Sequence, residues 1–329
     1  VVMFFSKRRW KLPTVAISMV APGGPWGGAG TFVSQLSARL WQRGWRVTYD
    51  LKSEPDVVVV IDPRRDHPAK RFGLAELEKF RAERPEVPIL HRVNECDRRK
   101  GTDDIDELLR RTNQLADHTV FVSGWLRDYF VDQWFDRERS HEVIYNGADC
   151  RAFHPIGNRR PADGEPVRLV THHWSDNWLK GFDFYQKLDE MLAGGELPGV
   201  EFRVIGRWPA EINWRATETI GPMSGEPLAE KLRECHLYLT ASRWEPCGMH
   251  HVEGAQCGLP MVYHEDGGGI VELGQCYGVG FRDDMGGAIR EAIGRLPELR
   301  DEVFREMPSG DRMVMAYVET LQRLVAQRN

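Results

Sequence analysis

A chain of 329 residues is too long for most single hydrophobic cores, so two domains are expected. Its hydrophobic fraction of 41% and charged fraction of 28% are those of an ordinary globular protein. The net charge of −5 gives no global positive field, which argues against nucleic acid as a partner.

Short β-branched runs alternate with amphipathic segments through the first half of the chain. The expected strands are residues 14–20, 45–50, 56–61, 87–90, 118–123 and 141–146, and the expected helices are 31–43, 74–84, 103–115 and 124–133. The run VVVVI is apolar on both faces of a strand. Such runs predict a parallel sheet that is covered by helices on both sides.

Residues 151–166 interrupt this alternation with Pro, Gly and charge, which predicts a linker between two domains. Beyond it, the expected strands are 167–173, 201–206, 237–242, 260–264 and 278–281, and the expected helices are 178–192, 226–234, 248–257 and 284–295. A last helical stretch, 301–327, has a break at Pro308. The pattern predicts an α/β fold of two doubly wound parallel-sheet domains, residues 1–150 and 167–300, with ligands at the carboxyl ends of the strands.

Six scattered cysteines without a CxxC motif indicate reduced thiols and a cytoplasmic protein. No stretch approaches the ~20 consecutive apolar residues of a membrane span. The first twelve residues, VVMFFSKRRWKL, mix apolar side chains with a basic cluster. This composition suits a peripheral contact with the inner face of an anionic membrane, and the alternative is a frayed end that leads into the first strand.

The stretch APGGPWGGAGTF, residues 21–32, follows the first expected strand and precedes a helix. Glycines such as Gly27 and Gly28 let the backbone approach an anion closely. The spacing is not that of the dinucleotide motif GxGxxG, and a simple turn is the alternative.

The stretch THHWSDNWLKGF, residues 171–182, also runs from a strand through a loop into a helix. Lys180 stands near the start of that helix, where a cation opposes the helix dipole. An anion bound at this place would explain the lysine, and a solvated surface lysine is the alternative.

The stretch SRWEPCGMHHVEGAQCGLP, residues 242–260, places Glu245 in a loop and Glu253 in the helix that follows. The amides at the helix start suit a diphosphate or a sugar hydroxyl. Each carboxylate can accept hydrogen bonds from two adjacent hydroxyls, as a ribose or a hexose presents them. The alternative is that Glu253 is an acid favoured by the dipole and Glu245 is a solvated loop residue.

A metal site is a third interpretation of this stretch, with His250, His251 and Glu253 joined by His172 and His173. Zinc requires three or four converging ligands with supporting hydrogen bonds. The sequence contains neither an HExxH motif nor a cysteine pair, so neither a metal nor any other cofactor is expected.

Three motifs together resemble the GT-B glycosyltransferases of family 4, a large retaining group. Residues 242–272 match the family's E-x7-E signature, its EA-x-x-x-G-x-P continuation and its GG-x-x-E motif. VIYNGADCRAFHP resembles the family's NG-x-D-x-x-x-F, and GGAGTFVSQLSARLWQRGWRV resembles its glycine loop and first helix. The similarity spans nearly the whole length, and it implies that residues 301–329 form a helix that returns to the first domain.

The resemblance also implies roles in the second domain. Glu245 would contact the donor sugar and Glu253 the ribose of the nucleotide. The phosphates would meet Lys180 and the backbone amides of the helix start, residues Cys247, Gly248, Met249 and His250.

Two positions depart from the family pattern. An arginine usually precedes the lysine by five residues, and Ser175 stands there, with His172, His173 or Asn177 as candidates to compensate. In the first domain, Gly27 and Gly28 would approach the phosphates. The family's histidine after the fourth strand, which would contact the 6-hydroxyl of the sugar, is displaced, so that Asn94 falls nearest to its position and His91 lies earlier.

The sequence therefore predicts a metal-independent, retaining glycosyltransferase. It would move a sugar from a UDP- or GDP-linked donor to the hydroxyl of a glycan or lipid-linked acceptor, in glycan, glycolipid or surface polysaccharide synthesis. A nucleotide-sugar epimerase of the same fold and a non-catalytic nucleotide-sugar binding protein are the alternatives.

Overall fold

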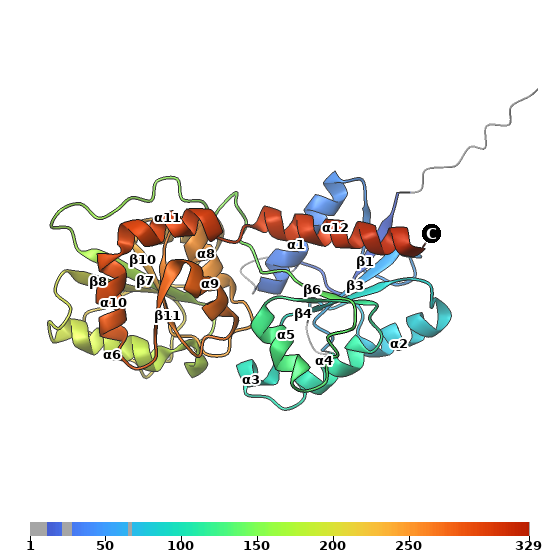
Figure 1. Cartoon of the computed structure of the whole chain (residues 1–329), viewed down its shortest axis with the longest axis horizontal. Helices are drawn as coiled ribbons and strands as arrows, with labels where there is room; N and C mark the ends of the chain where they lie inside the picture. Colours follow the sequence, from blue (N-terminus) through green and yellow to red (C-terminus); the bar gives the residue numbers. More distant parts are fainter. Residues whose placement is uncertain (1–11, 22–27, 65–67, 329) are drawn as a thin grey trace, which may run out of the picture.

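The computed structural model describes residues 12–21, 28–64 and 68–328, and these form two α/β units side by side (Figure 1). Each unit contains a six-stranded sheet in which all neighbouring strands are parallel. The predicted fold class, two doubly wound parallel-sheet domains, is confirmed.

The first sheet has the strand order β2-β1-β3-β4-β5-β6. Its strands are β1 (Thr14–Ile17), β2 (Arg46–Thr48), β3 (Val57–Ile61), β4 (Ile89–Val93), β5 (His118–Phe121) and β6 (His141–Val143). Its helices are α1 (Gly28–Gln42), α2 (Leu74–Glu83), α3 (Asp97–Lys100), α4 (Ile105–Asn113) and α5 (Gly124–Val131).

Strand β3 shows why a continuous apolar run is needed here. Val57, Val59 and Ile61 belong to the core beneath α1, whereas Val58 and Val60 belong to the core beneath α2. Because side chains alternate between the two faces of a strand, every position of β3 is buried.

The second sheet has the order β12-β11-β10-β7-β8-β9. Its strands are β7 (Val167–His173), β8 (Val200–Gly206), β9 (Glu218–Ile220), β10 (Leu237–Thr240), β11 (Met261–His264) and β12 (Gly278–Phe281). Its helical segments are η1 (Trp178–Lys180), α6 (Phe182–Ala193), α7 (Gly225–Arg233), α8 (Met249–Gln256), α9 (Gly269–Tyr277), α10 (Met285–Gly294) and α11 (Leu296–Glu306).

Some segments differ from the sequence expectation. The helix expected over 178–192 is broken into η1 and α6 at Gly181, whose φ of +90° is left-handed. Strand β9 and helices α3 and α9 were not predicted. Strand β9 is an exposed edge strand, and α9 begins among glycines, so neither shows the expected pattern.

The chain crosses between the two units twice, and the two crossings run next to each other. Ala148 pairs with Ser309 in a parallel bridge, and the carbonyl of Ala148 accepts from the amide of Gly310 at 2.9 Å. A Cβ on Gly147 would lie 2.2 Å from the backbone of Ser309, so a glycine is required for this approach.

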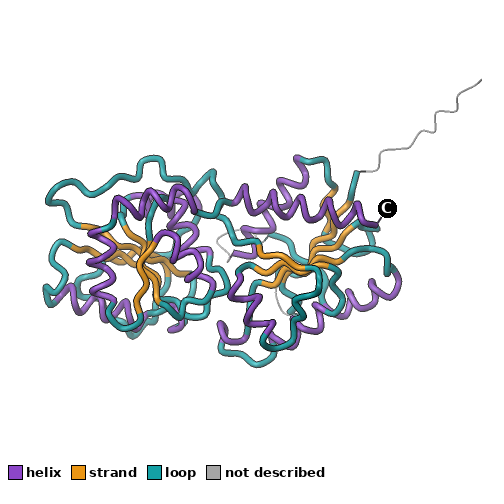
Figure 2. The backbone as a smooth tube through the Cα atoms, viewed as in Figure 1, coloured by secondary structure: helices purple, strands orange, loops and turns teal. Residues whose placement is uncertain are grey.

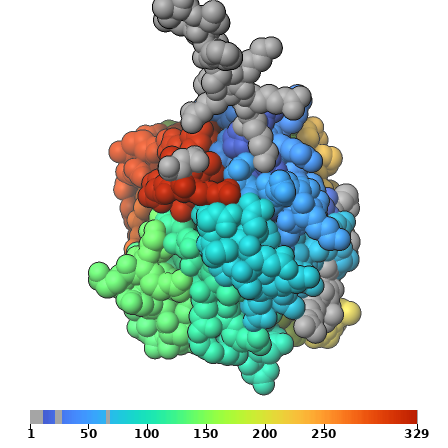
Figure 3. Space-filling model, turned by 90° about the vertical axis from the view of Figure 1, so that its right-hand side faces the viewer, coloured from blue at the N-terminus to red at the C-terminus, as the bar shows by residue number. Residues whose placement is uncertain are grey.

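The second crossing leads into α12 (Gly310–Arg328), which packs on α1 of the first domain (Figures 2 and 3). The rings of Phe32 and Tyr317 meet edge to face with centroids 4.7 Å apart. Leu321 and Leu324 lie in the same core as β1 and β3. Pro308 lies between α11 and α12, where it cannot continue a helix.

The two domains also contact each other directly through α5 and α9. Glu272 of α9 accepts from the amides of Gly124 and Trp125 at the start of α5 and from the hydroxyl of Tyr145. Apolar residues of both helices share one buried cluster. Within the described residues, no helix combines the length and the apolar composition that crossing a membrane requires.

Candidate functional site

The carboxyl ends of β7 and β10 open into a cavity of about 240 Å³ to which both domains contribute. The first domain supplies Gly28, Thr31, Glu95, Arg99 and Lys100, and the second supplies His172, His173, Trp174, Ser175, Lys180, Glu245, Gly248, Met249, His250 and Glu253. Most residues that the sequence singled out therefore lie around one space.

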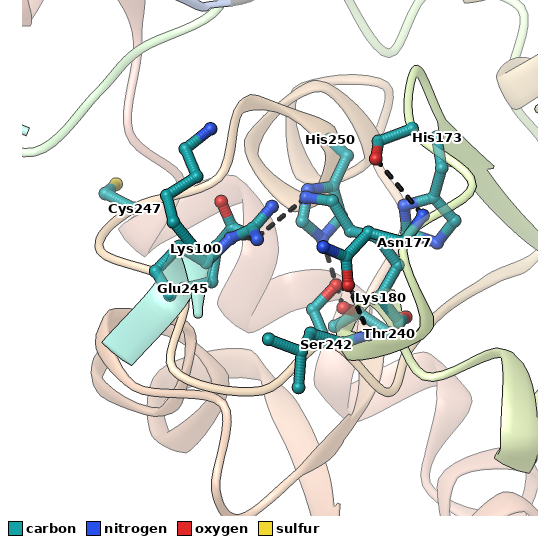
Figure 4. Close-up of polar contacts among 12 residues, drawn as sticks. Lys100, His173, Asn177, Lys180, Thr240, Ser242, Glu245, Cys247 and His250 are labelled. Atoms are coloured by element: carbon teal, nitrogen blue, oxygen red, sulfur yellow. Dashed lines mark hydrogen bonds and ion pairs between the residues drawn. The ribbon is translucent and has the colours of Figure 1, made fainter. Parts of the chain in front are cut away.

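Glu245 holds two cations on a single carboxylate oxygen. Its Oε2 accepts from Nε of Arg99 at 2.9 Å and from Nζ of Lys180 at 2.8 Å. The side chains of Arg99, Lys180 and Glu245 are only 9%, 10% and 12% exposed. Figure 4 shows Glu245 and Lys180 on neighbouring loops of the second domain.

The charges of these three groups control one another's ionisation. Burial would raise the pKa of Glu245, but Arg99 and Lys180 together hold it well below its usual range. Burial lowers the pKa of Lys180, and Glu245 opposes this effect. The attraction of Glu245 raises the pKa of Arg99. The carboxylate is therefore ionised at neutral pH.

Backbone contacts fix the loop that carries Glu245. The amide of Glu245 donates to the carbonyl of Gly267, and its carbonyl accepts from the amide of Gly269 at 2.8 Å. Trp244, the preceding residue, has a φ of +53°, which is strained for a residue with a side chain. The loop is held on both sides of the glutamate, which places the carboxylate accurately.

Lys180 reaches the cavity because of a close approach at Gly181. A Cβ on Gly181 would lie 2.4 Å from the carbonyl oxygen of Ala241, just after β10. The side chain of Asn177 accepts from the amide of Leu179 and so caps the short helix η1. Because the turn lies against the end of β10, the lysine faces the Glu245 loop.

Glu253 lies in the second turn of α8 and is paired with a histidine. Its Oε2 lies 2.8 Å from Nε2 of His172, and Nδ1 of His172 lies 3.1 Å from the hydroxyl of Tyr238. The glutamate is 9% exposed and lines the cavity. The histidine orients the carboxylate, whose other oxygen, Oε1, accepts no hydrogen bond from a described residue.

The start of α8 presents backbone amides to the cavity. Gly248 occupies the N-cap position, and no side chain among the described residues caps the helix. A Cβ on Gly28 of the first domain would lie 2.5 Å from Cγ of Met249, so the two chain segments almost touch. The positive end of α8 therefore lies against the glycine-containing start of α1.

Two histidines of the site, His173 and His250, are neutral. Burial holds the pKa of His173 and of His250 well below the usual range. Nε2 of His173 lies 2.9 Å from the hydroxyl of Thr171, and Nε2 of His250 lies 3.1 Å from the hydroxyl of Thr240. Figure 4 shows His250 beside Thr240. These rings act as fixed polar groups and not as cations.

A second cavity of about 280 Å³ borders the first and shares Thr31, Trp174 and Glu253 with it. Its remaining lining comes from Ala21, from α1, from the segment 149–153 and from the start of α7. Glu253 thus lies at the border of the two cavities, where it could contact an extended ligand that occupies both of them.

A larger hollow lies elsewhere. It measures about 990 Å³, is formed by the β3–α2 loop, α2 and α4 of the first domain, and contains none of the predicted site residues. We place the site in the smaller cavity because that is where the buried charges and the free helix start converge.

Two predicted site residues that the structure describes, Asn94 and Cys247, do not line the 240 Å³ cavity. Asn94 borders a separate small hollow with Asp62 and Arg64. Cys247 is buried, and its carbonyl accepts from Nδ2 of Asn146 at 2.6 Å. Gly27 lies outside the described residues. In the part of the chain that the structure describes, no group of three or more His, Cys, Asp or Glu side chains is placed to hold a metal ion.

Sequence motifs did not single out Glu95, Arg99 and Lys100, which lie in α3 and in the segment just before it. Arg99 is the most important of the three. Ser175 stands at the position where the family pattern has an arginine, and the cation beside Lys180 comes instead from the first domain. The basic run DRRK, residues 97–100, was the available signal, because it lies just beyond the carboxyl end of β4.

Two facing domains of this kind define the GT-B fold of glycosyltransferases, and the chain has that fold. The sequence matches no protein-family model and no curated protein.

Solved structures share the fold over almost the whole chain. Sucrose-phosphate synthase from Thermosynechococcus elongatus has a TM-score of 0.67 at 16% identity, covering 96% of this chain and 100% of the other. HepE from Anabaena in complex with UDP-glucose has a TM-score of 0.64 at 15% identity, covering 95% and 100%. WaaG, a glycosyltransferase involved in lipopolysaccharide biosynthesis, has a TM-score of 0.61 at 13% identity, covering 94% and 99%. At these identities the similarity shows the fold.

Proposed function

We propose that this protein transfers a sugar from a nucleoside diphosphate sugar to a hydroxyl acceptor. The observation that carries the proposal is the cavity between the two domains, where Lys180, the uncapped start of α8 and two buried glutamates converge. Structures with this fold include complexes with UDP and with UDP-glucose, which supports a nucleotide sugar as the donor.

Each group has a role that follows from its chemistry. Glu253, between the two cavities, accepts hydrogen bonds from the ribose hydroxyls. The diphosphate lies against Lys180 and the amides of Met249 and His250. Glu245 accepts from hydroxyls of the transferred sugar.

We further propose that the reaction retains the anomeric configuration. The bond between the anomeric carbon and the diphosphate oxygen breaks, and a bond to the acceptor oxygen forms on the same face. The acceptor proton passes to the departing phosphate oxygen. The protein positions the two substrates and stabilises the separating charges with fixed groups, so we propose that no divalent metal is required.

A panel of UDP- and GDP-linked sugars tests the proposal. The true donor should raise the melting temperature, because a ligand at 100 times its dissociation constant adds about 2.7 kcal/mol of stability. With an accepted glycan or lipid-linked acceptor, NMR should show a product of the donor's anomeric configuration, with or without a chelator. A sugar that stays on the nucleotide in epimerised form, or a donor that is bound but never consumed, would contradict the proposal.

A further inference from the structure

Two cations that line the cavity have no role in the function proposed above: Lys100, which pairs with Glu95 at 3.1 Å, and Arg99. Arg99 stands on α3 of the first domain, while its partner Glu245 and the second cation, Lys180, belong to the second domain. A single carboxylate charge faces two positive charges, so this trio carries one excess positive charge in a buried place.

The guanidinium of Arg99 is only partly used. Its Nε donates to Glu245, and its two terminal nitrogens make no hydrogen bond to any described residue. Arg99 lines the cavity and is 7% exposed. A planar guanidinium with free terminal donors is suited to bidentate contact with a phosphate.

The neighbouring arginine provides a contrast. Arg98 is exposed, does not line the cavity, and places its guanidinium 4.7 Å from the centre of the Trp244 ring. Two adjacent residues of α3 with the same charge therefore have different surroundings, and only Arg99 faces the proposed donor site.

We propose that Arg99 binds the diphosphate of the donor together with Lys180, and that Glu245 holds both cations in position until the donor enters. This inference rests on the proposed function. It means that the first domain supplies part of the phosphate site, so the donor links the two domains by contacting both.

Double-mutant calorimetry with UDP and GDP tests the inference. In the Glu245→Gln background, Arg99 has no carboxylate to hold, so a purely structural Arg99 becomes dispensable. We expect Arg99→Gln in that background to weaken binding of the preferred nucleoside diphosphate about ten- to hundredfold, the value of a charged hydrogen bond. Arg99→Lys should restore part of the loss.

Two controls separate the outcomes. Arg98→Gln removes the same charge from α3 and should leave affinity unchanged within about twofold, and the monophosphate should lose much less than the diphosphate on Arg99→Gln. Equal affinity of the single and double variants for the diphosphate would overturn the inference while the proposed function stands. A wild-type protein that binds neither UDP nor GDP would overturn the proposed function itself.

Discussion

The two domains have the same architecture but contribute differently to the cavity. The second domain provides a densely bonded edge, in which Glu253 is held by His172 and Glu245 is held by its loop and by Lys180. The first domain provides a glycine that allows close approach, Gly28, and a charged pair of residues on α3, Arg99 and Lys100. The difference suggests that the second domain forms the nucleotide site in advance and that the first domain completes it.

The largest expected effect concerns Glu245. Glu245→Gln should lower transfer about 10²–10³-fold, because the group acts where charge develops. Affinity for the nucleoside diphosphate should not fall, since the change releases Lys180 and Arg99 from a competing carboxylate. Steady-state kinetics and calorimetry measure the two quantities, and Glu319→Gln, an exposed position on α12, is the control. Equal losses in the transfer rate and in the affinity for the nucleoside diphosphate would contradict the proposal that Glu245 contacts the sugar and not the phosphates.

A smaller effect is expected at Glu253. Glu253→Gln should weaken nucleoside diphosphate binding by about 1.5–3 kcal/mol, the contribution of a charged hydrogen bond to the ribose. Inorganic pyrophosphate has no ribose, so its affinity should not change. Calorimetry with both ligands makes the comparison within one variant. A parallel loss for pyrophosphate would assign Glu253 to the phosphates or to the fold.

Acid should destabilise the second domain more steeply than the first. Burial lowers the pKa of His251 to about 3 and holds those of His173 and His250 well below the usual value, whereas in the first domain burial lowers the pKa of His91 to about 3. As the pH falls below about 6.5, these histidines take up protons in the unfolded chain but not in the folded protein. The free energy of unfolding therefore falls. Each such histidine lowers the free energy of unfolding by about 1.4 kcal/mol for every pH unit below this value.

Hydrogen exchange measures this difference domain by domain. After correction for the intrinsic pH dependence of exchange, amides of β7 and β10 should lose protection faster between pH 6.5 and 4.5 than amides of β3 and β4. Identical slopes for the two sheets would mean that the neutral histidines around the cavity do not control acid stability.

Hydrophobic patterns were enough to predict the two sheets, since short β-branched runs such as VVVVI favour strands that are buried on both faces. The order of strand, loop and helix in residues 237–257 placed Glu245 in the loop and Glu253 in the helix, and the structure has both there. The pairing of Arg99 with Glu245 spans 146 positions and joins two domains, and no local pattern contains it. The break at Gly181 was missed because a left-handed glycine depends on the neighbouring Ala241.

Hydrogen exchange with and without the preferred nucleoside diphosphate shows whether the ligand binds in the cavity that both domains line. We predict that the ligand protects the start of α1, residues 97–100 and the start of α8 together, because the cavity takes its lining from both domains. Protection confined to the large hollow of the first domain, between α2 and α4, or protection of the second domain alone, would contradict it.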